Sequence, residues 1–102
     1  MAYFLVIARD GTDAEAPTRR KTTRPTHLEG IKSMVDNGEL LYGGGILDDA
    51  GAMVGSAIFM EYPSRKELDD WLKREPYVVN GVWKDIQVIP IRMTVQNGRI
   101  AP

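Results

Sequence analysis

Apolar and polar positions alternate in blocks along the chain, and these blocks predict four strands. Residues 2–8 form a continuous apolar run rich in aromatic and β-branched residues, which is typical of a central strand covered on both faces. Further strands are predicted at 40–47, 52–61 and about 83–93. The turn-forming residues 48–51, Asp-Asp-Ala-Gly, join the second and third strands into a hairpin.

A first amphipathic helix is predicted to begin at Pro25 or Thr26. Proline suits a first helical position, and Thr26 with Glu29 has capping-box spacing, so the two signals differ by one residue. Residues 10–22 before this start are polar and are expected to form a loop. The helix should end at 36–38, Asp-Asn-Gly. Its predicted buried stripe consists of apolar residues at three- and four-residue intervals: Leu28, Ile31, Met34 and Val35.

A second helix follows the third strand. Ser64 and Glu67 form a capping box, and Pro76 ends the helix at about Glu75, because the residue before a proline is pushed out of the α region. Its predicted buried positions are Leu68, Trp71 and Leu72. Trp71 and Trp83 are assigned to the core or to an interface.

The predicted order is β-α-β-β-α-β, which is the doubled, split βαβ arrangement of ferredoxin-like α+β folds. Right-handed crossovers then give one four-stranded antiparallel sheet with both helices on one face. In the last strand both alternating sets are apolar, Ile86 with Val88 and Ile89 with Ile91. A sheet with two apolar faces and helices on only one predicts a homodimer or higher assembly. We expect a single domain over 1–102, with a C-terminal tail over about 94–102.

The charge and residue content exclude several function classes. Thirteen basic and fourteen acidic residues give a net charge of −1, which argues against a nucleic-acid-binding protein. The one basic cluster, 19–21, is interpreted as a solvated loop or helix face. The absence of cysteine excludes disulfides, thiolate catalysis and cysteine zinc sites, and a single histidine excludes a His-rich metal site within one subunit. No metal or organic cofactor is called for. The first apolar run is too short for a signal sequence or a membrane span, so no membrane association and a cytoplasmic location are expected.

The predicted topology gathers several polar residues at one edge of the sheet. The end of the first strand, the start of the first helix, the hairpin and the end of the second helix all meet there. These segments contribute Asp10, Arg24, His27, Tyr42 to Gly45, and Glu75 to Tyr77.

His27 is the chain's only histidine and the main candidate for chemistry. A neutral imidazole exchanges protons near pH 7, and a carboxylate on its second nitrogen fixes the tautomer. Asp10 or Glu75 could be that carboxylate, and Arg24 could hold a substrate carboxylate. Alternatively, His27 bonds a backbone carbonyl in the first helical turn, Glu75 is an exposed helix-end residue, Asp10 belongs to a turn, and Arg24 is a surface charge.

Tyr42 and Tyr77 could line a pocket with their hydroxyls inward, although core packing is an alternative. Gly43 to Gly45 lack a following helix and a Gly-Lys-Ser/Thr motif, so a nucleotide loop is not indicated. A bulge or a close backbone approach at a pocket rim explains them better.

Three stretches, RPTHLEGIKSMVDNGELLYGGG, GSAIFMEYPSRKEL and EPYVVNGVWKDIQVIPI, resemble the YciI-like (YCII-related) family. The family pattern of Arg-x-x-His-Leu is matched by Arg24, His27 and Leu28. Its usual Asp-Pro-Tyr reads Glu75-Pro76-Tyr77 here, and its Gly-Pro reads Gly44-Gly45. The resemblance implies a dimeric α+β barrel with a His–carboxylate pair in a pocket, and relatives that include lactone-processing dehalogenases and isomerases. Glu75 lengthens the carboxylate's reach by one methylene, and Gly45 loosens the pocket wall.

These observations leave two main hypotheses of function. The first is a cofactor-independent lyase- or isomerase-like enzyme that transfers protons on a compact anionic substrate. Its catalytic residues would be His27 with Glu75 or Asp10, and its binding residues would be Arg24, Tyr42, Gly44, Gly45 and Tyr77. The second is a non-catalytic domain that holds a metabolite in the same pocket. A third reading, a purely structural dimerisation module, predicts a filled edge without a cavity.

Overall fold

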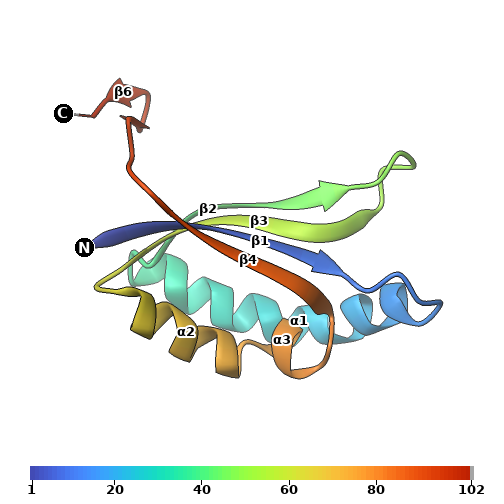
Figure 1. The fold of residues 1–102 in the computed structure, drawn as a ribbon. Helices are drawn as coiled ribbons and strands as arrows, with labels where there is room; N and C mark the ends of the chain where they lie inside the picture. The colour runs from blue at the N-terminus through green and yellow to red at the C-terminus, as the bar shows by residue number, and fades with distance from the viewer. Residues whose placement is uncertain (102) are drawn as a thin grey trace.

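A computed structural model describes residues 1–101, and its main elements follow the predicted order. In chain order these are β1 (Ala2–Asp10), α1 (Ala16–Asp36), β2 (Leu40–Leu47), β3 (Met53–Tyr62), α2 (Arg65–Arg74), α3 (Pro76–Val79), β4 (Trp83–Ile91), β5 (Val95–Gln96) and β6 (Arg99–Ile100). Figure 1 shows the helices beneath one face of the sheet.

The sheet has the strand order β2-β3-β1-β4, and all its neighbouring strands are antiparallel. Val6 lies at the centre, opposite Ile58 on β3 and Val88 on β4. The two central strands, β1 and β3, are therefore the first strands of the two βαβ halves. This arrangement confirms the predicted ferredoxin-like α+β fold.

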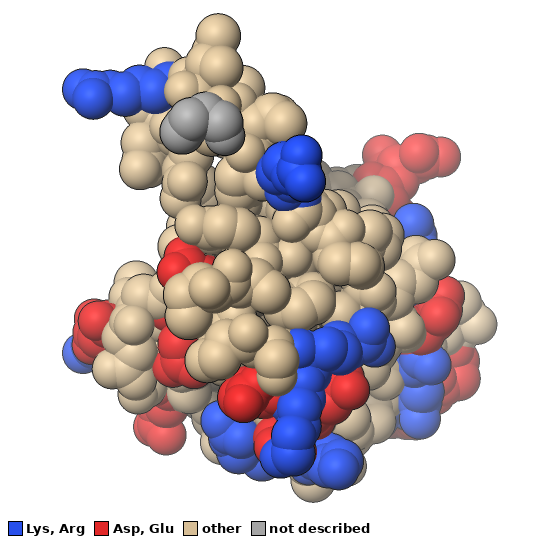
Figure 2. Space-filling view, turned by 60° about the vertical axis from the view of Figure 1, so that its left-hand side comes forward, with Lys and Arg blue, Asp and Glu red and all other residues tan. Residues whose placement is uncertain are grey.

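The two faces of the sheet differ in burial. On the helical side Phe4, Val6 and Ala8 are almost fully buried, and they join the two predicted core tryptophans, each 3% exposed. The face away from the helices carries the alternate residues, among them Leu5, Phe59 and Ile89, with Ile89 39% exposed. Figure 2 shows charged side chains gathered over the helical layer and a broad uncharged surface above it, below the C-terminal hairpin.

Helix α1 begins nine residues earlier than the earlier of the two predicted starts, so the expected loop over 10–22 is wrong for its second half. The proline that marks the helix start is Pro17, within the first turn, whereas Pro25 lies inside the helix. A proline there removes one intrahelical hydrogen bond. Contacts made by the first half of α1 offset that loss: Arg19 Nε donates to the Gly81 carbonyl at 3.2 Å, and Thr23 is buried.

The longer helix also changes which residues it buries. Met34 is buried as predicted, but Leu28 is 46% exposed and Val35 is 52% exposed. The predicted stripe is therefore wrong at these two positions. In their place α1 buries Thr23 and His27, so its inner face is partly polar.

Local signals at the other helix ends are confirmed. At the end of α1, Gly38 has a positive φ of 76°, and Glu39 N donates to the Met34 carbonyl at 2.9 Å, as in a Schellman motif. Ser64 caps α2 by accepting from Lys66 N at 3.3 Å and also bonds Glu67. The short helix α3, which begins at Pro76, was not predicted.

Two short strands lie in the C-terminal tail. β4 ends at Ile91, and β5 and β6 form a small hairpin around Asn97 and Gly98, both with positive φ. An Asn-Gly pair favours such a tight turn. Figure 1 shows this hairpin standing away from the main sheet. Residue 102 of the predicted tail lies outside the described residues.

Candidate functional site

His27 and Glu75 meet in the interior, although 48 positions separate them in sequence. Pro76 stops α2, and Glu75 adopts an extended conformation (φ −64°, ψ 124°) as the N-cap of α3. Its Oε1 accepts a hydrogen bond from Tyr77 N at 3.2 Å and bonds His27 Nδ1. Glu75 is only 2% exposed, so the alternative of an exposed helix-end carboxylate is wrong.

The pairing bears on the tautomer of the imidazole. Opposite an ionised Glu75, which can only accept hydrogen bonds, His27 Nδ1 is the donor. In the neutral ring this leaves a lone pair on Nε2. Nε2 forms no hydrogen bond within residues 1–101, is not among the fully buried unpaired atoms, and belongs to a side chain that lines a cavity. The arrangement therefore presents a basic nitrogen to the cavity.

Aromatic rings fix the plane of the imidazole. The Tyr77 ring stacks on His27 with a centroid separation of 3.8 Å and an interplanar angle of 9°. Trp83 packs edge-on against both rings. Tyr77 is 1% exposed, and burial raises the pKa of its hydroxyl, which therefore stays protonated over the neutral range.

Asp10 does not contact His27 and is bound to Arg20 instead. The Arg20 guanidinium forms a bidentate pair with the Asp10 carboxylate, with Nε–Oδ2 at 2.6 Å and Nη2–Oδ1 at 3.2 Å. It also donates to Ser56 Oγ at 3.2 Å and lies 5.0 Å from the centroid of the Tyr77 ring. The structure thus brings Glu75, and not Asp10, to the histidine.

Arg24 lies one turn after Arg20 on the same side of α1 and lines the same cavity. It is exposed, and its guanidinium makes no hydrogen bond or ion pair within residues 1–101. Of the two cavity arginines, Arg20 is occupied by Asp10 and Arg24 remains available to an anion.

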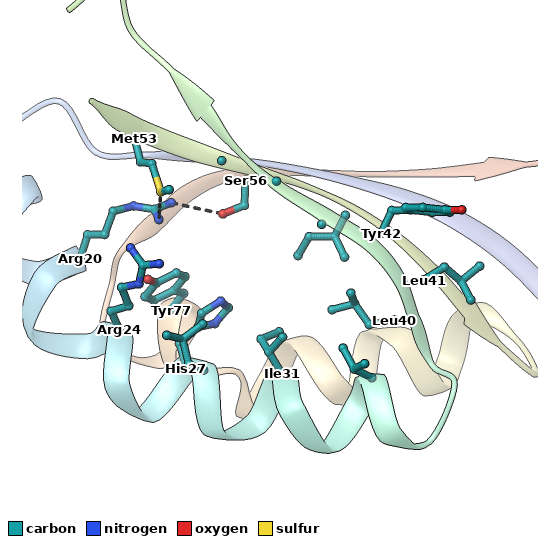
Figure 3. A pocket seen from close by; sticks show the side chains of 16 residues that line it. Arg20, Arg24, His27, Ile31, Leu40, Leu41, Tyr42, Met53, Ser56 and Tyr77 are labelled. Atoms are coloured by element: carbon teal, nitrogen blue, oxygen red, sulfur yellow. Dashed lines mark hydrogen bonds between the residues drawn. The ribbon is translucent and has the colours of Figure 1, made fainter. Parts of the chain in front are cut away.

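The cavity lies between α1 and the edge strand β2 and has a volume of about 450 Å³. Figure 3 shows Arg20, Arg24, His27 and Tyr77 grouped at one end, below Met53 and Ser56. The cavity contradicts the hypothesis of a purely structural dimerisation module, which predicts that this edge is filled.

Glycines open the wall on the β2 side. Gly43 and Gly45 pair with Ile58 and Ser56, whose side chains share the helical face, and all four residues line the cavity. The predicted bulges flank the glycines, between Leu40 and Tyr42 and after Ile46, and do not fall on them. A Cβ on Gly45 would approach the Met53 side chain to 2.8 Å, so a side chain, and not the predicted backbone segment, lies close to this glycine.

The remaining predicted binding residues are placed as follows. Gly44 lines the cavity but pairs with Ala57, on the opposite face of the sheet. Tyr42 also lines it, yet its side chain is directed away from His27, and its hydroxyl donates to Asn97 Oδ1 at 3.4 Å. The expected inward hydroxyl at Tyr42 is therefore wrong.

Sequence reasoning missed Arg20, which it placed in a solvated basic cluster. Its side chain is 12% exposed, whereas Arg19 is paired with Asp13 near the surface. A usable signal existed in the spacing of Arg20, Arg24, His27 and Ile31, which share one helical face. The shared face was not recognised because the helix was predicted to start after Arg20 and Arg24.

Two further findings concern metal ions and membranes. Across residues 1–101, no cluster of three or more His, Cys, Asp or Glu side chains is arranged to hold a metal ion. None of the helices in this range has the length and apolar character needed to cross a bilayer.

Comparison with known proteins assigns the family. A profile of the YCII-related domain matches residues 1–92. The chain belongs to the YCII-related family. Protein YciI of Escherichia coli is 30% identical over 95 residues, which cover 87% of this chain and 95% of that protein. The relative from Emericella nidulans described as derivative of benzaldehyde biosynthesis cluster protein C is 33% identical over 91 residues, covering 82% of this chain and 87% of that protein.

A solved structure shares the fold of this YCII-related chain. The 5-chloro-2-hydroxyhydroquinone dehydrochlorinase TftG of Burkholderia phenoliruptrix, in complex with 2,5-dihydroxybenzoquinone, superimposes with a TM-score of 0.76. The match covers 88% of this chain and 93% of TftG at 22% identity. At that identity the likeness establishes the fold.

Proposed function

We propose that this chain is a small-molecule enzyme in which His27 transfers protons as a general acid and base. The observation that carries the proposal is the buried His27–Glu75 pair with Nε2 left unpartnered beside a cavity. Glu75 holds the tautomer and orientation of the ring and does not itself touch the substrate. Arg24, the unpaired arginine of the cavity, is the anchor for the substrate's anionic group.

The reaction class follows from the groups present. His27 Nε2 removes a proton from a carbon next to a carbonyl, and the Glu75 carboxylate stabilises the resulting imidazolium. The electron pair released from the C–H bond then expels a leaving group, which is elimination, or is reprotonated by Nε2 at another carbon, which is isomerisation. Within residues 1–101 no serine, cysteine or threonine side chain is hydrogen-bonded to His27, so proton transfer fits this site better than acyl transfer.

The named relatives support this class without defining the substrate. TftG is a dehydrochlorinase, and loss of HCl from a hydroxyhydroquinone requires removal of a proton and departure of a leaving group. The Emericella relative is described as a biosynthesis cluster protein. We therefore place hydroxylated quinols first among the compounds to be tested.

Hydrogen–deuterium exchange tests the proposal before a product is known. Each compound is incubated with the protein in D2O, and loss of the carbon-bound proton signal is followed by NMR. We expect His27→Asn to lower the exchange rate about 10²- to 10⁴-fold, the usual contribution of a general acid or base. Glu75→Gln should lower it at least about tenfold, because it removes the charge that supports the imidazolium.

Glu29→Gln is the matched control, since Glu29 is exposed on the same helix two residues after His27. Its exchange rate should equal that of the wild type. Exchange that persists in folded His27→Asn would exclude His27 as the base. Binding of a compound without any exchange would favour the alternative, a non-catalytic metabolite-binding domain.

We also propose that a second copy of the chain covers the bare face of the sheet. Leu5, Phe59 and Ile89 lie side by side there through the pairing of β3 and β4 with β1. The adjoining C-terminal hairpin exposes Val95 (61%) and Ile100 (88%). An isolated two-stranded hairpin is marginal in water, and a partner surface would stabilise it.

The oligomeric state tests this assembly directly. Analytical ultracentrifugation of the full chain should give a dimer or a larger assembly, and Ile89→Lys should shift it towards the monomer. Lys84→Glu, on the exposed beginning of β4, provides the control and should leave the assembly unchanged. A monomeric wild type at micromolar concentration would contradict the proposal.

A further inference from the structure

The lining of the cavity changes in character along α1. Arg20, Arg24 and His27 form one end, and the following turns contribute Leu28, Ile31 and Val35. The strands opposite this second end add Leu40, Leu41 and Ile58. Figure 3 shows this division, with the charged side chains at one end and the aliphatic side chains of Ile31 and Leu40 towards the other.

The aliphatic section is long compared with the reacting end. Val35 lies eight residues after His27, which is about 12 Å along a helix. The total volume of about 450 Å³ falls in the range of roughly 300–1,000 Å³ that holds drug-sized ligands. A compact anion bound between Arg24 and His27 would leave the aliphatic section empty.

The exposed side chains of this section also require an explanation. Leu28 and Val35 are about half exposed, although they stand on a helix whose opposite positions are polar. Both line the cavity beside the partly buried Ile31. Exposed apolar side chains that line one concave surface are typical of a ligand-binding groove.

We propose that the ligand of this site is amphipathic, with an anionic head bound by Arg24 beside His27 and an apolar tail along Ile31, Val35 and Leu40. This inference rests on the proposed function for the position of the head and adds the chemical class of the remainder. The tail is an aliphatic chain or a second ring, since no charged side chain lines the far end.

A homologous series of straight-chain carboxylates, from acetate to octanoate, tests the inference. Binding is measured by NMR from the amide shifts of Gly43, Gly44 and Gly45, which line the cavity with backbone atoms only. We expect Kd to fall about two- to fourfold for each added methylene, up to the ~0.8 kcal/mol of one fully buried CH₂. Alkylamines of equal length should bind more weakly at every length because Arg24 repels their head.

Two variants separate the two ends. Val35→Ser should weaken octanoate binding at least threefold and leave acetate unchanged. Val79→Ser is the control, because Val79 is also exposed (64%, against 52% for Val35) but lies outside the cavity. Arg24→Gln should weaken all chain lengths by a similar factor, with Arg74→Gln as the control on α2. Folding of each variant is checked by its amide spectrum.

A Kd that is independent of chain length, or equal losses in Val35→Ser and Val79→Ser, would overturn the amphipathic ligand. The proposed proton transfer would survive that result, because His27→Asn is tested by exchange and not by binding. Conversely, an intact chain-length dependence together with unchanged exchange in His27→Asn would retain the ligand class and reject the catalytic role.

Discussion

The two halves of helix α1 perform different tasks although they form one continuous element. In the part of α1 up to His27, Arg20 pairs with Asp10 at the end of β1, and His27 pairs with Glu75 between α2 and α3. In the part after His27, Met34 alone is buried, while Leu28 and Val35 are exposed to the cavity. Polar contacts therefore fix the end that carries the proposed base, and the other end presents apolar side chains to the cavity.

Burial also distinguishes two ion pairs of similar geometry. Arg20–Asp10 and Arg19–Asp13 are bidentate pairs formed by adjacent arginines. The first has side chains 12% and 6% exposed, and the second 28% and 53%. Only the first holds the site together, because removal of one partner from a buried pair leaves an uncompensated charge.

The largest expected effect on stability is that of Arg20→Met. We expect a loss of about 3–5 kcal/mol in the free energy of unfolding, measured by urea denaturation, because Asp10 is left buried without its partner. Arg19→Met should lose no more than about 1 kcal/mol, since its pair is exposed.

The double variant Asp10→Asn with Arg20→Met tests the cause of that loss. It should recover much of the stability that Arg20→Met alone removes, because no charge then remains buried. Equal losses in the Arg19 and Arg20 variants would refute the distinction between the two pairs.

At the apolar end, neighbouring residues offer a matched pair of truncations. Met34→Ala should lower stability by about 2–5 kcal/mol, because Met34 packs in the core. Val35→Ala should change it by no more than about 0.5 kcal/mol, since that side chain is half exposed. Thermal or urea unfolding measures both, and similar losses would indicate that the second half of α1 is packed throughout.

The smallest expected effect is the acid dependence of the exposed pair. The hydrogen bond from Arg19 lowers the pKa of Asp13 from 3.8 to about 2. A pKa that is lower in the folded state gives a stabilisation that is full above pH 4 and lost as the pH falls towards 2. Asp13→Asn should therefore flatten the pH dependence of stability over that interval only, measured by urea unfolding between pH 2 and pH 6.

The fold was predictable because its signals are local and mutually consistent. The alternation of strands, the Ser64 cap and the stop at Pro76 each depend on a few adjacent residues. The start of α1 was not predictable in this way. Pro25 is a strong local signal for a helix start, and contacts from Arg19, Arg20 and Thr23 to distant segments override it.

The site was predictable in outline for the same reason. The predicted topology alone places His27 and Glu75 at one edge of the sheet, so both residues were candidates from the sequence. Which carboxylate reaches His27 depends on how α1 is rotated about its axis. In the observed rotation Arg20 binds Asp10, so Asp10 is not available to His27 and Glu75 pairs with it instead. The Tyr42 hydroxyl bonds Asn97 in the C-terminal hairpin, whose local Asn-Gly turn signal was overlooked in the sequence.

The tautomer of His27 is the most direct test of whether Glu75 leaves Nε2 free to act as the base in the cavity. Long-range ¹H–¹⁵N correlation on labelled protein, at a pH where the ring is neutral, reports which nitrogen carries the hydrogen. We predict hydrogen on Nδ1 in the wild type and in Asp10→Asn, and a shift towards Nε2–H in Glu75→Leu. Hydrogen on Nε2 in the wild type, or a tautomer unaffected by Glu75→Leu, would contradict the proposed role of Glu75 and remove the proposed base from the cavity.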